Sequence, residues 1–254
     1  MKPSNAEVEL SVEIRADRES VFRIMSDPDA FPRWMGPGST LEPWEGGVVI
    51  VPFDNGIVAY GRVLEIAEYR LAFSWGYDPE SDVPASVVRL TLHEGDEGTV
   101  LILRHGGLES EDERTGHMAG WRHYTAVLAD VCLGDQASRI DEAVAAWIDS
   151  WNADDPRDRA KLLQSCYAED GQFRDQGALI EDRADMDAYI EGARRFLPDA
   201  ETRLDGGVDR CHEYLRFPVT ISDGSGEPLR RGWQFAELGA EGRLRRIVAY
   251  WDQS

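Results

Sequence analysis

The histidines are the first residues to consider for chemistry, because imidazole binds metals and carries protons near neutral pH. The chain has five of them: His93, His105, His117, His123 and His212. None shows the four-residue helical spacing with a glutamate that makes a zinc motif, so the sequence predicts no metal site. His117 and Trp121 are four residues apart and share one helix face. His117 therefore either reaches a cavity or is a partly exposed histidine at the start of a helix.

Other motifs of catalysis or cofactor binding are incomplete. The pairs Gly46-Gly47 and Gly106-Gly107 lack the lysine and the following helix of a phosphate-binding loop. No serine lies in the glycine-flanked turn that forms a nucleophile elbow. The sequence therefore predicts no cofactor.

Composition excludes several classes of partner. The 254 residues carry a formal net charge of −21, which repels nucleic acid and anionic membrane surfaces, so neither is expected to bind. No stretch is long and apolar enough to cross a bilayer, and Met1 to Glu9 lacks the apolar run of a secretory signal. The cysteines Cys132, Cys166 and Cys211 are far apart, which fits a reduced, cytoplasmic protein.

Two amphipathic helices between His117 and Trp151 organise the chain. They meet at the break 133–136, where Gly134 suits a helix C-cap. Apolar residues at spacings of three and four form one face on each helix: Trp121, Tyr124, Thr125, Leu128 and Cys132, then Ile140, Val144, Trp147, Ile148 and Trp151. The first helix closes one predicted domain, residues 1–136, and the second opens another, residues 137–254.

The first domain is rich in predicted strands. Val8 to Ile14 alternates apolar and polar residues, and Asp17 caps a helix that stops at Asp27-Pro28. Residues 31–38 and 109–114 are predicted loops, and further strands are expected at 48–51, 57–66, 71–75, 88–92 and 100–102. An antiparallel sheet wrapped on the C-terminal helix buries both apolar faces and makes the fold α+β.

A set of short motifs in this half resembles a known family. They are Asp27-Pro28 with Trp34 downstream, Gly46-Gly47, Gly61 to Ile66, Gly98-Thr99 and Gly120-Trp121. Residues 7–134 resemble the helix-grip superfamily of polyketide cyclases and lipid-transfer domains, in particular its branch of homologues of the activator of the heat-shock-protein-90 ATPase. The resemblance implies an apolar cavity between the sheet and the last helix.

The aromatic residues of this half are candidates for lining that cavity. Besides His117, they are Trp34, Tyr60, Phe73, Trp75 and Trp121, with Arg62, Arg89 or His105 expected to meet the polar end of a flat, apolar ligand. The alternative is that these side chains only form the core.

The second half is predicted to place helices first and a bent antiparallel sheet last. Tyr167 to Asp175, Glu241 to Leu244 and Ala249 to Trp251 resemble the nuclear-transport-factor-two-like superfamily, in particular its SnoaL-like branch. The resemblance implies a cone-shaped α+β barrel. That fold hosts isomerases, dehydratases, cyclases and plain binding proteins.

The resemblance makes Asp175 the candidate general base, because ketosteroid-isomerase-like members have a catalytic carboxylate at the matching position. The aromatic residues expected to line the cone are Trp147, Trp151, Phe173, Tyr189, Trp233 and Tyr250. This chain departs from the isomerases, because Trp147 stands where they have a tyrosine and Arg231 where they have a protonated acid. A bridging or loop-capping role is the alternative for Asp175.

Two functions follow from these patterns. The first is binding of an apolar small molecule in the helix-grip cavity, the cone, or both. The alternative is a cofactor-independent cyclase, isomerase or dehydratase that acts on a polyketide-like or steroid-like substrate through Asp175. A third interpretation, action on a chaperone, rests on the family name alone. A homodimer through the sheet of the C-terminal domain is also expected.

Overall fold

The computed structural model describes residues 7–80, 86–239 and 242–252 and divides into two compact units, residues 1–134 and 135–254. The sequence placed the boundary between residues 136 and 137. Both units combine helices with a sheet, so the predicted α+β class is confirmed. In the part of the chain that the structure describes, no helix is long and apolar enough to cross a membrane.

The N-terminal unit is built on one antiparallel sheet of seven strands in the order β1-β7-β6-β5-β4-β3-β2. Its β1 alternates as predicted, with Val8 and Ile14 buried and the glutamates between them exposed. The strands are β1 (Glu7–Ile14), β2 (Thr40–Leu41), β3 (Val48–Pro52), β4 (Val58–Ala67), β5 (Arg70–Trp75), β6 (Ser86–Gly95) and β7 (Gly98–Gly106).

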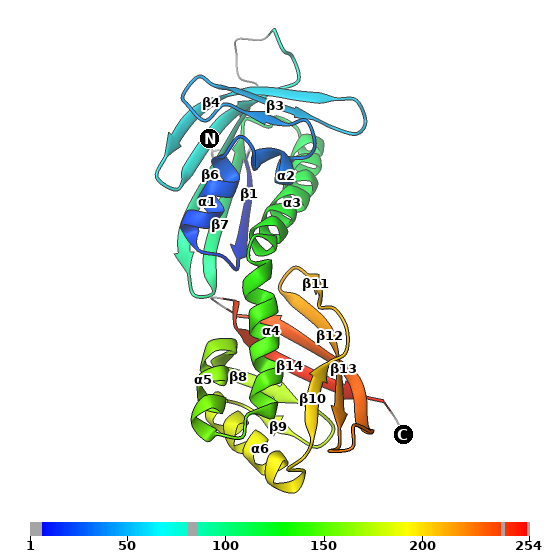
Figure 1. Cartoon of the computed structure of the whole chain (residues 1–254). Coiled ribbons are helices and arrows are strands. Elements are labelled where there is room, and N and C mark those ends of the chain that lie inside the picture. The colour runs from blue at the N-terminus through cyan, green and yellow to red at the C-terminus, as the bar shows by residue number, and fades with distance from the viewer. Residues whose placement is uncertain (1–6, 81–85, 240–241, 253–254) are drawn as a thin grey trace. The chain divides into compact units, whose positions relative to one another are not determined.

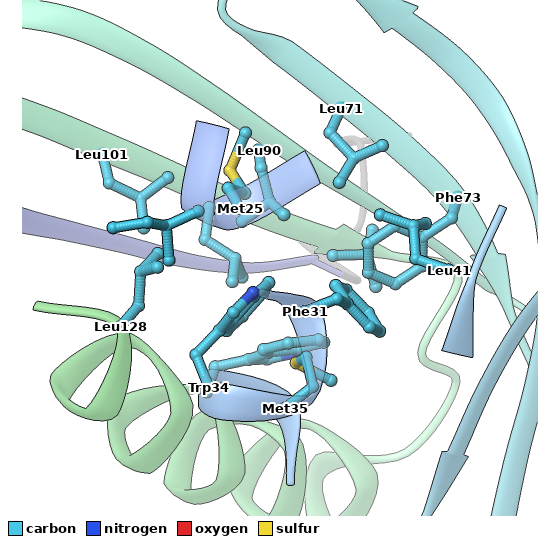
Figure 2. Packing of buried hydrophobic residues seen from close by; sticks show 14 of the residues in the cluster. Met25, Phe31, Trp34, Met35, Leu41, Leu71, Phe73, Leu90, Leu101 and Leu128 are labelled. Carbon is cyan, nitrogen blue, oxygen red and sulfur yellow. The ribbon is translucent and has the colours of Figure 1, made fainter. Parts of the chain in front are cut away.

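Three helices pack with this sheet, namely α1 (Arg18–Ser26), α2 (Phe31–Met35) and α3 (Glu111–Gly134) (Figure 1). Asp17 caps α1 by accepting a hydrogen bond from the Ser20 backbone N–H at 2.8 Å. Residues 31–35 form a short helix and not the predicted loop. Pro32 suits its first turn, and Gly36 ends it with φ at +104°. Figure 2 shows that Phe31 and Trp34 of α2 pack among Phe73, Leu90 and Leu128.

The long helix α3 begins inside the segment predicted as a charged loop. Glu113 Oε2 accepts from the backbone N–H groups of Glu109 and Ser110 at 2.9 and 3.0 Å, and Ser110 Oγ accepts from the Glu113 N–H at 3.1 Å. This reciprocal pair is a capping box, which satisfies N–H groups that the first helical turn leaves without partners. It sets the first turn of α3, and Glu113 is a residue of the candidate site.

The C-terminal unit opens with α4 (Ala137–Asn152) and α5 (Pro156–Cys166), and α6 (Arg183–Phe196) follows two of its strands. Its sheet runs β10-β12-β13-β14-β8-β9, with β11 paired to β12, and β8 lies parallel to β14. The strands are β8 (Tyr167–Arg174), β9 (Leu179–Ile180), β10 (Glu201–Leu204), β11 (Asp209–Cys211), β12 (Tyr214–Ser222), β13 (Pro228–Leu238) and β14 (Leu244–Trp251). Residues 240 and 241, the second of which begins the motif Glu241 to Leu244, lie outside the described residues.

The second sheet does not close into the predicted barrel. Among the described residues, the end strands β9 and β10 do not pair with each other. The backbone of Thr202 in β10 is instead satisfied by the side chain of Asn152 at the end of α4, through bonds of 2.7 and 2.8 Å. An amide side chain that donates and accepts in this way takes the place of a neighbouring strand, so the sheet ends there.

Candidate functional site

A pocket of about 390 Å³ lies in the N-terminal unit, where the first half of α3 meets the end of β5 and the connection between β3 and β4. Its walls are mainly apolar side chains with a few polar groups at the rim, as in sites that bind small molecules. The lining residues are Phe53, Ile57, Trp75, Tyr77, Glu113, Gly116, His117, Gly120, Trp121 and Tyr124.

Four aromatic rings in this lining form a closed circuit of contacts. The ring centroids of Phe53 and Trp75 are 6.2 Å apart, and those of Trp75 and Trp121 are 5.4 Å apart. Tyr124 completes the circuit, at 6.3 Å from Trp121 and 6.5 Å from Phe53. These distances are typical of edge-to-face and tilted aromatic pairs, which hold one another in place. The wall that they form is therefore rigid.

Gly116 and Gly120 keep the surface of α3 recessed beside these rings. A Cβ atom added at either position would meet nothing within 4 Å, so packing does not require glycine there. Glycine in a helix interior costs roughly 1 kcal/mol relative to alanine. Both positions lie on the pocket wall. The helix thus carries two destabilising residues whose shared structural effect is the space in front of Trp121.

Behind the pocket, a buried hydrogen-bond network joins His105 to the indole of Trp121 and to the backbone of Trp75. Trp121 Nε1–H donates to His105 Nδ1 at 3.0 Å, so the neutral ring carries its proton on Nε2. That N–H donates to Ser86 Oγ at 2.8 Å, and Ser86 donates to the Trp75 carbonyl at 3.0 Å. Burial, and second the charge of His117, lower the pKa of His105 to about 3. His105 is therefore a neutral positioning residue.

At the rim, His117 and Tyr77 form a second hydrogen-bonded chain. His117 Nδ1–H donates to the Glu113 carbonyl at 2.8 Å, which leaves Nε2 as the acceptor for the Tyr77 hydroxyl at 3.2 Å. The Tyr77 oxygen in turn lies 3.5 Å from Trp75 Nε1. The His117 ring meets the His105 ring edge-on, with centroids 4.6 Å apart. Both nitrogens of His117 are thus occupied by groups of the protein.

Two acidic residues bring negative charge to the neighbourhood of the pocket, Glu113 in its lining and Asp54 through its effect on Tyr124. Glu113 lines the pocket, and the backbone N–H of Ser110, ahead of that of Glu109, lowers the pKa of this carboxyl. Burial first, and then the charge of Asp54, raise the pKa of the Tyr124 phenol. Asp54 therefore lies close enough to Tyr124 to act on it. Neither Lys nor Arg is among the described residues that line the pocket.

The structure brings together three of the six residues predicted for this site, namely Trp75, His117 and Trp121. Trp34 and Phe73 are fully buried in the core, and Tyr60 lies on β4 outside the lining. Sequence reasoning missed Phe53, Tyr77 and Glu113. For Glu113 a signal existed, because residues 113, 117, 120 and 124 fall at helical spacings on one face.

The aromatic residues inside the C-terminal unit pack on one another. Trp147 is fully buried, donates from Nε1 to Gln234 Oε1 at 2.7 Å, and stacks on Tyr167 with centroids 5.4 Å apart. Its ring also meets those of Trp151 and Phe173, and Phe173 lies 6.1 Å from Tyr189. Four predicted cone residues therefore form one packed cluster: Trp147, Trp151, Phe173 and Tyr189.

Asp175 lies at the end of β8 and is engaged by two donors. Its Oδ1 accepts from the Gly177 backbone N–H at 2.7 Å, and its Oδ2 accepts from Trp251 Nε1 at 3.1 Å. Burial, followed by the charge of Asp175, raises the pKa of Tyr189, so the phenol lies near this carboxylate. The geometry is that of a carboxylate which closes a short loop and ties it to β14.

The other three predicted residues lie elsewhere on this sheet. Trp233 and Tyr250 pair across β13 and β14, and their side chains are 41% and 62% exposed, on the face away from buried Gln234 and Ala249. Arg231 lines an open depression of about 860 Å³ where β13 begins and β14 ends, together with Trp251. These three residues therefore do not join the buried aromatic cluster.

Metal ligands do not gather at either place. Within residues 7–80, 86–239 and 242–252, no group of three or more His, Cys, Asp or Glu side chains is arranged to hold a metal ion. The side chains that line the N-terminal pocket offer aromatic rings, hydrogen-bonding groups and the carboxylate of Glu113.

Comparison with known proteins matches the N-terminal half to a family. Residues 15–132 match the family model of activator of Hsp90 ATPase homolog 1-like protein. A solved AHSA1-like protein from Rhizobium etli is 36% identical, over 50% of this chain and 81% of its own, with a TM-score of 0.40. The Aha1 dimer from Colwellia psychrerythraea is 15% identical, over 50% of this chain and 95% of its own, with a TM-score of 0.44.

The SnoaL-like resemblance also has a counterpart among solved structures. A SnoaL-like family protein from Agrobacterium tumefaciens is 24% identical, over 46% of this chain and 99% of its own, with a TM-score of 0.43. No curated protein matches the chain. Both families named from sequence motifs are thus found among the matches.

Proposed function

The N-terminal unit belongs to the activator of Hsp90 ATPase homolog 1-like family, and we propose that it binds an apolar small molecule in the pocket beside α3. The observation that carries the proposal is the recess at Gly116 and Gly120, in front of Trp75 and Trp121. Two glycines in a helix interior lower its stability without a packing need. A pocket that must stay open explains why they are there.

The size and lining of the pocket fit a small molecule. Its volume of about 390 Å³ lies within the range of sites that enclose compounds of drug size. The rigid aromatic wall is already formed, so a ligand needs to order few side chains when it binds. Burial of an apolar ligand against these rings provides the main driving force.

A titration with the neutral fluorescent probe N-phenyl-1-naphthylamine tests this proposal. Gly120→Leu puts a side chain into the pocket, and we expect it to weaken probe binding at least tenfold. Gly192→Leu in α6 is the matched control, because a Cβ at Gly192 also meets nothing within 4 Å. Both changes favour the helix. Equal probe binding by Gly120→Leu and the wild type would contradict the proposal.

We further propose that a second copy of the chain covers the exposed face of the C-terminal sheet. Trp233, Phe235 and Tyr250 are between 41% and 62% exposed on this face, and the rings of Phe235 and Tyr250 are 5.7 Å apart. Arg246 and Glu237 place both signs of charge beside them, which suits a self-complementary two-fold interface. Light scattering at twice 28.5 kDa would support the dimer, and the monomer mass would refute it.

We also propose a reducing, cytoplasmic location. None of Cys132, Cys166 and Cys211, all in the described part of the chain, takes part in a disulfide. Thiol alkylation of protein taken from its own cells, followed by mass spectrometry, should find all three cysteines modified. A disulfide between any two of them would contradict this location.

A further inference from the structure

We propose that the ligand of the N-terminal pocket is a cation, namely an apolar compound that carries an ammonium group, and that the ammonium lies against the aromatic wall. The inference rests on the proposed function, because it needs the pocket to bind a small molecule. Three properties of the pocket carry it, which are the ring circuit, the charge of the rim, and the engagement of the N–H and O–H donors.

The ring circuit is a suitable receptor for a positive charge. A cation is attracted to the face of an aromatic ring within about 6 Å of its centroid, most strongly by tryptophan. Phe53, Trp75, Trp121 and Tyr124 lie at 5.4 to 6.5 Å from one another around the circuit. A cation held against the face of one ring therefore has other aromatic rings of the circuit close by. Substituted ammonium groups are recognised by such aromatic surfaces.

The charge of the rim has the complementary sign. Glu113 is one of the lining residues, its carboxylate caps the start of α3, and the charge of Asp54 acts on Tyr124. The nearby guanidinium of Arg114 donates to the carbonyls of Leu108 and Glu109 and is not part of the lining. A cationic ligand gains from this field, whereas an anionic ligand is repelled.

Most donors that could bind an anion or an acceptor-rich ligand are already used. Trp121 Nε1–H is bonded to His105, and Trp75 Nε1–H points to Tyr77. The Tyr77 hydroxyl donates to His117, whose own N–H donates to the Glu113 carbonyl. The pocket therefore presents aromatic side chains and an acidic residue to a ligand, and few hydrogen-bond donors. This combination selects ammonium over carboxylate or phosphate compounds.

A pair of isosteric probes measures how much the positive charge of a ligand contributes to its binding. Phenyltrimethylammonium and tert-butylbenzene have nearly the same shape and differ by one positive charge. Each competes with N-phenyl-1-naphthylamine on the full chain, and we expect the ammonium to bind about tenfold more tightly. Equal or tighter binding of tert-butylbenzene would overturn the cationic ligand and leave the apolar pocket standing. If neither compound nor the fluorescent probe binds, the proposed function falls as well.

Three single variants test which residues produce the preference for the ammonium probe. Glu113→Gln keeps a side chain able to complete the capping box and removes the charge, so ammonium affinity should fall about threefold while that of tert-butylbenzene is unchanged. Glu111→Gln is the control, because it removes a charge from the same first turn at a position outside the lining. Phe53→Leu keeps apolar volume but loses the ring and should weaken the ammonium about two- to fivefold. If Glu111→Gln lowered ammonium affinity as much as Glu113→Gln does, the assignment of the effect to the charge of Glu113 at the rim would be overturned.

Discussion

Both units place aromatic rings between a helix and a sheet, but they use the space around the rings differently. In the C-terminal unit, Trp147 sits at the centre of a cluster in which each ring contacts others, and its indole N–H is satisfied by Gln234. In the N-terminal unit, Trp75 and Trp121 are also in contact and hydrogen-bonded, yet they border a pocket of about 390 Å³.

The difference comes from what the helix places opposite the rings. On α4, Val144 lies one turn before Trp147 on the buried face, and Trp151, one turn after it, contacts its ring. On α3 the positions next to Trp121 and His117 are Gly120 and Gly116, which have no side chain. Aromatic residues therefore do not by themselves mark a binding site. A binding site is marked by the unfilled volume beside the aromatic residues.

The largest expected effect is on stability in the filled cluster. Trp147→Ala should lower the free energy of unfolding by about 3 to 5 kcal/mol, because it opens a cavity and leaves Gln234 without its donor. Phe53→Ala in the pocket wall should cost only about 1 to 2 kcal/mol, since this ring is partly exposed. Urea denaturation followed by circular dichroism compares the two, and equal losses would remove the distinction between the regions.

A smaller effect is the acid sensitivity of the N-terminal unit. Burial lowers the pKa of His105 from its ordinary value of 6.5 to about 3, so the unfolded chain binds a proton at a higher pH than the folded chain. His105 therefore supports the fold fully above pH 6.5, and this support is lost as the pH falls towards 3. Between pH 7 and pH 5 the loss should be about 2 kcal/mol.

The control for this prediction is His105→Gln. A glutamine can accept from Trp121 and donate to Ser86 but does not titrate. Urea midpoints measured at several pH values should therefore fall less steeply between pH 7 and pH 5 in the variant than in the wild type. The same slope in both proteins would show that the buried histidine is not the source of the acid sensitivity.

The smallest effect is expected at Asp175. Asn keeps one acceptor oxygen, so Asp175→Asn should lose one of the two bonds to Gly177 and Trp251 and cost about 1 kcal/mol. Binding of N-phenyl-1-naphthylamine should not change, because Asp175 belongs to the other unit. A large drop in probe affinity in this variant would place the site in the C-terminal unit and reverse the comparison.

Sequence periodicity predicted the elements that carry the pocket but only part of its wall. The spacing of His117, Trp121 and Tyr124 was enough to place them on one face of α3. Phe53 and Tyr77 come from the ends of strands, where no local period indicates which way a side chain points. Which aromatic residue borders a cavity and which, like Trp34, fills the core depends on contacts far apart in the sequence.

Periodicity also left open which face of the last strands, β13 and β14, is buried. Along β13 the apolar residues Trp233 and Phe235 alternate with Gln234 and Ala236, and large apolar side chains suggest the inward face. The structure buries Gln234, because it accepts the hydrogen bond of Trp147. A shift of one residue exchanges the two faces of a strand, and the buried face carries Ala236 and Leu238 beside Gln234.

The most direct test of the central claim follows the indole N–H signals of the eight tryptophans by NMR while N-phenyl-1-naphthylamine is added to the full chain. Signals are assigned with single Trp→Phe variants. The indoles of Trp75 and Trp121 in the pocket wall should shift during the titration, whereas those of Trp147 and Trp251 in the C-terminal unit should stay in place. Shifts confined to Trp147 and Trp251 would contradict the assignment of the binding site to the N-terminal pocket.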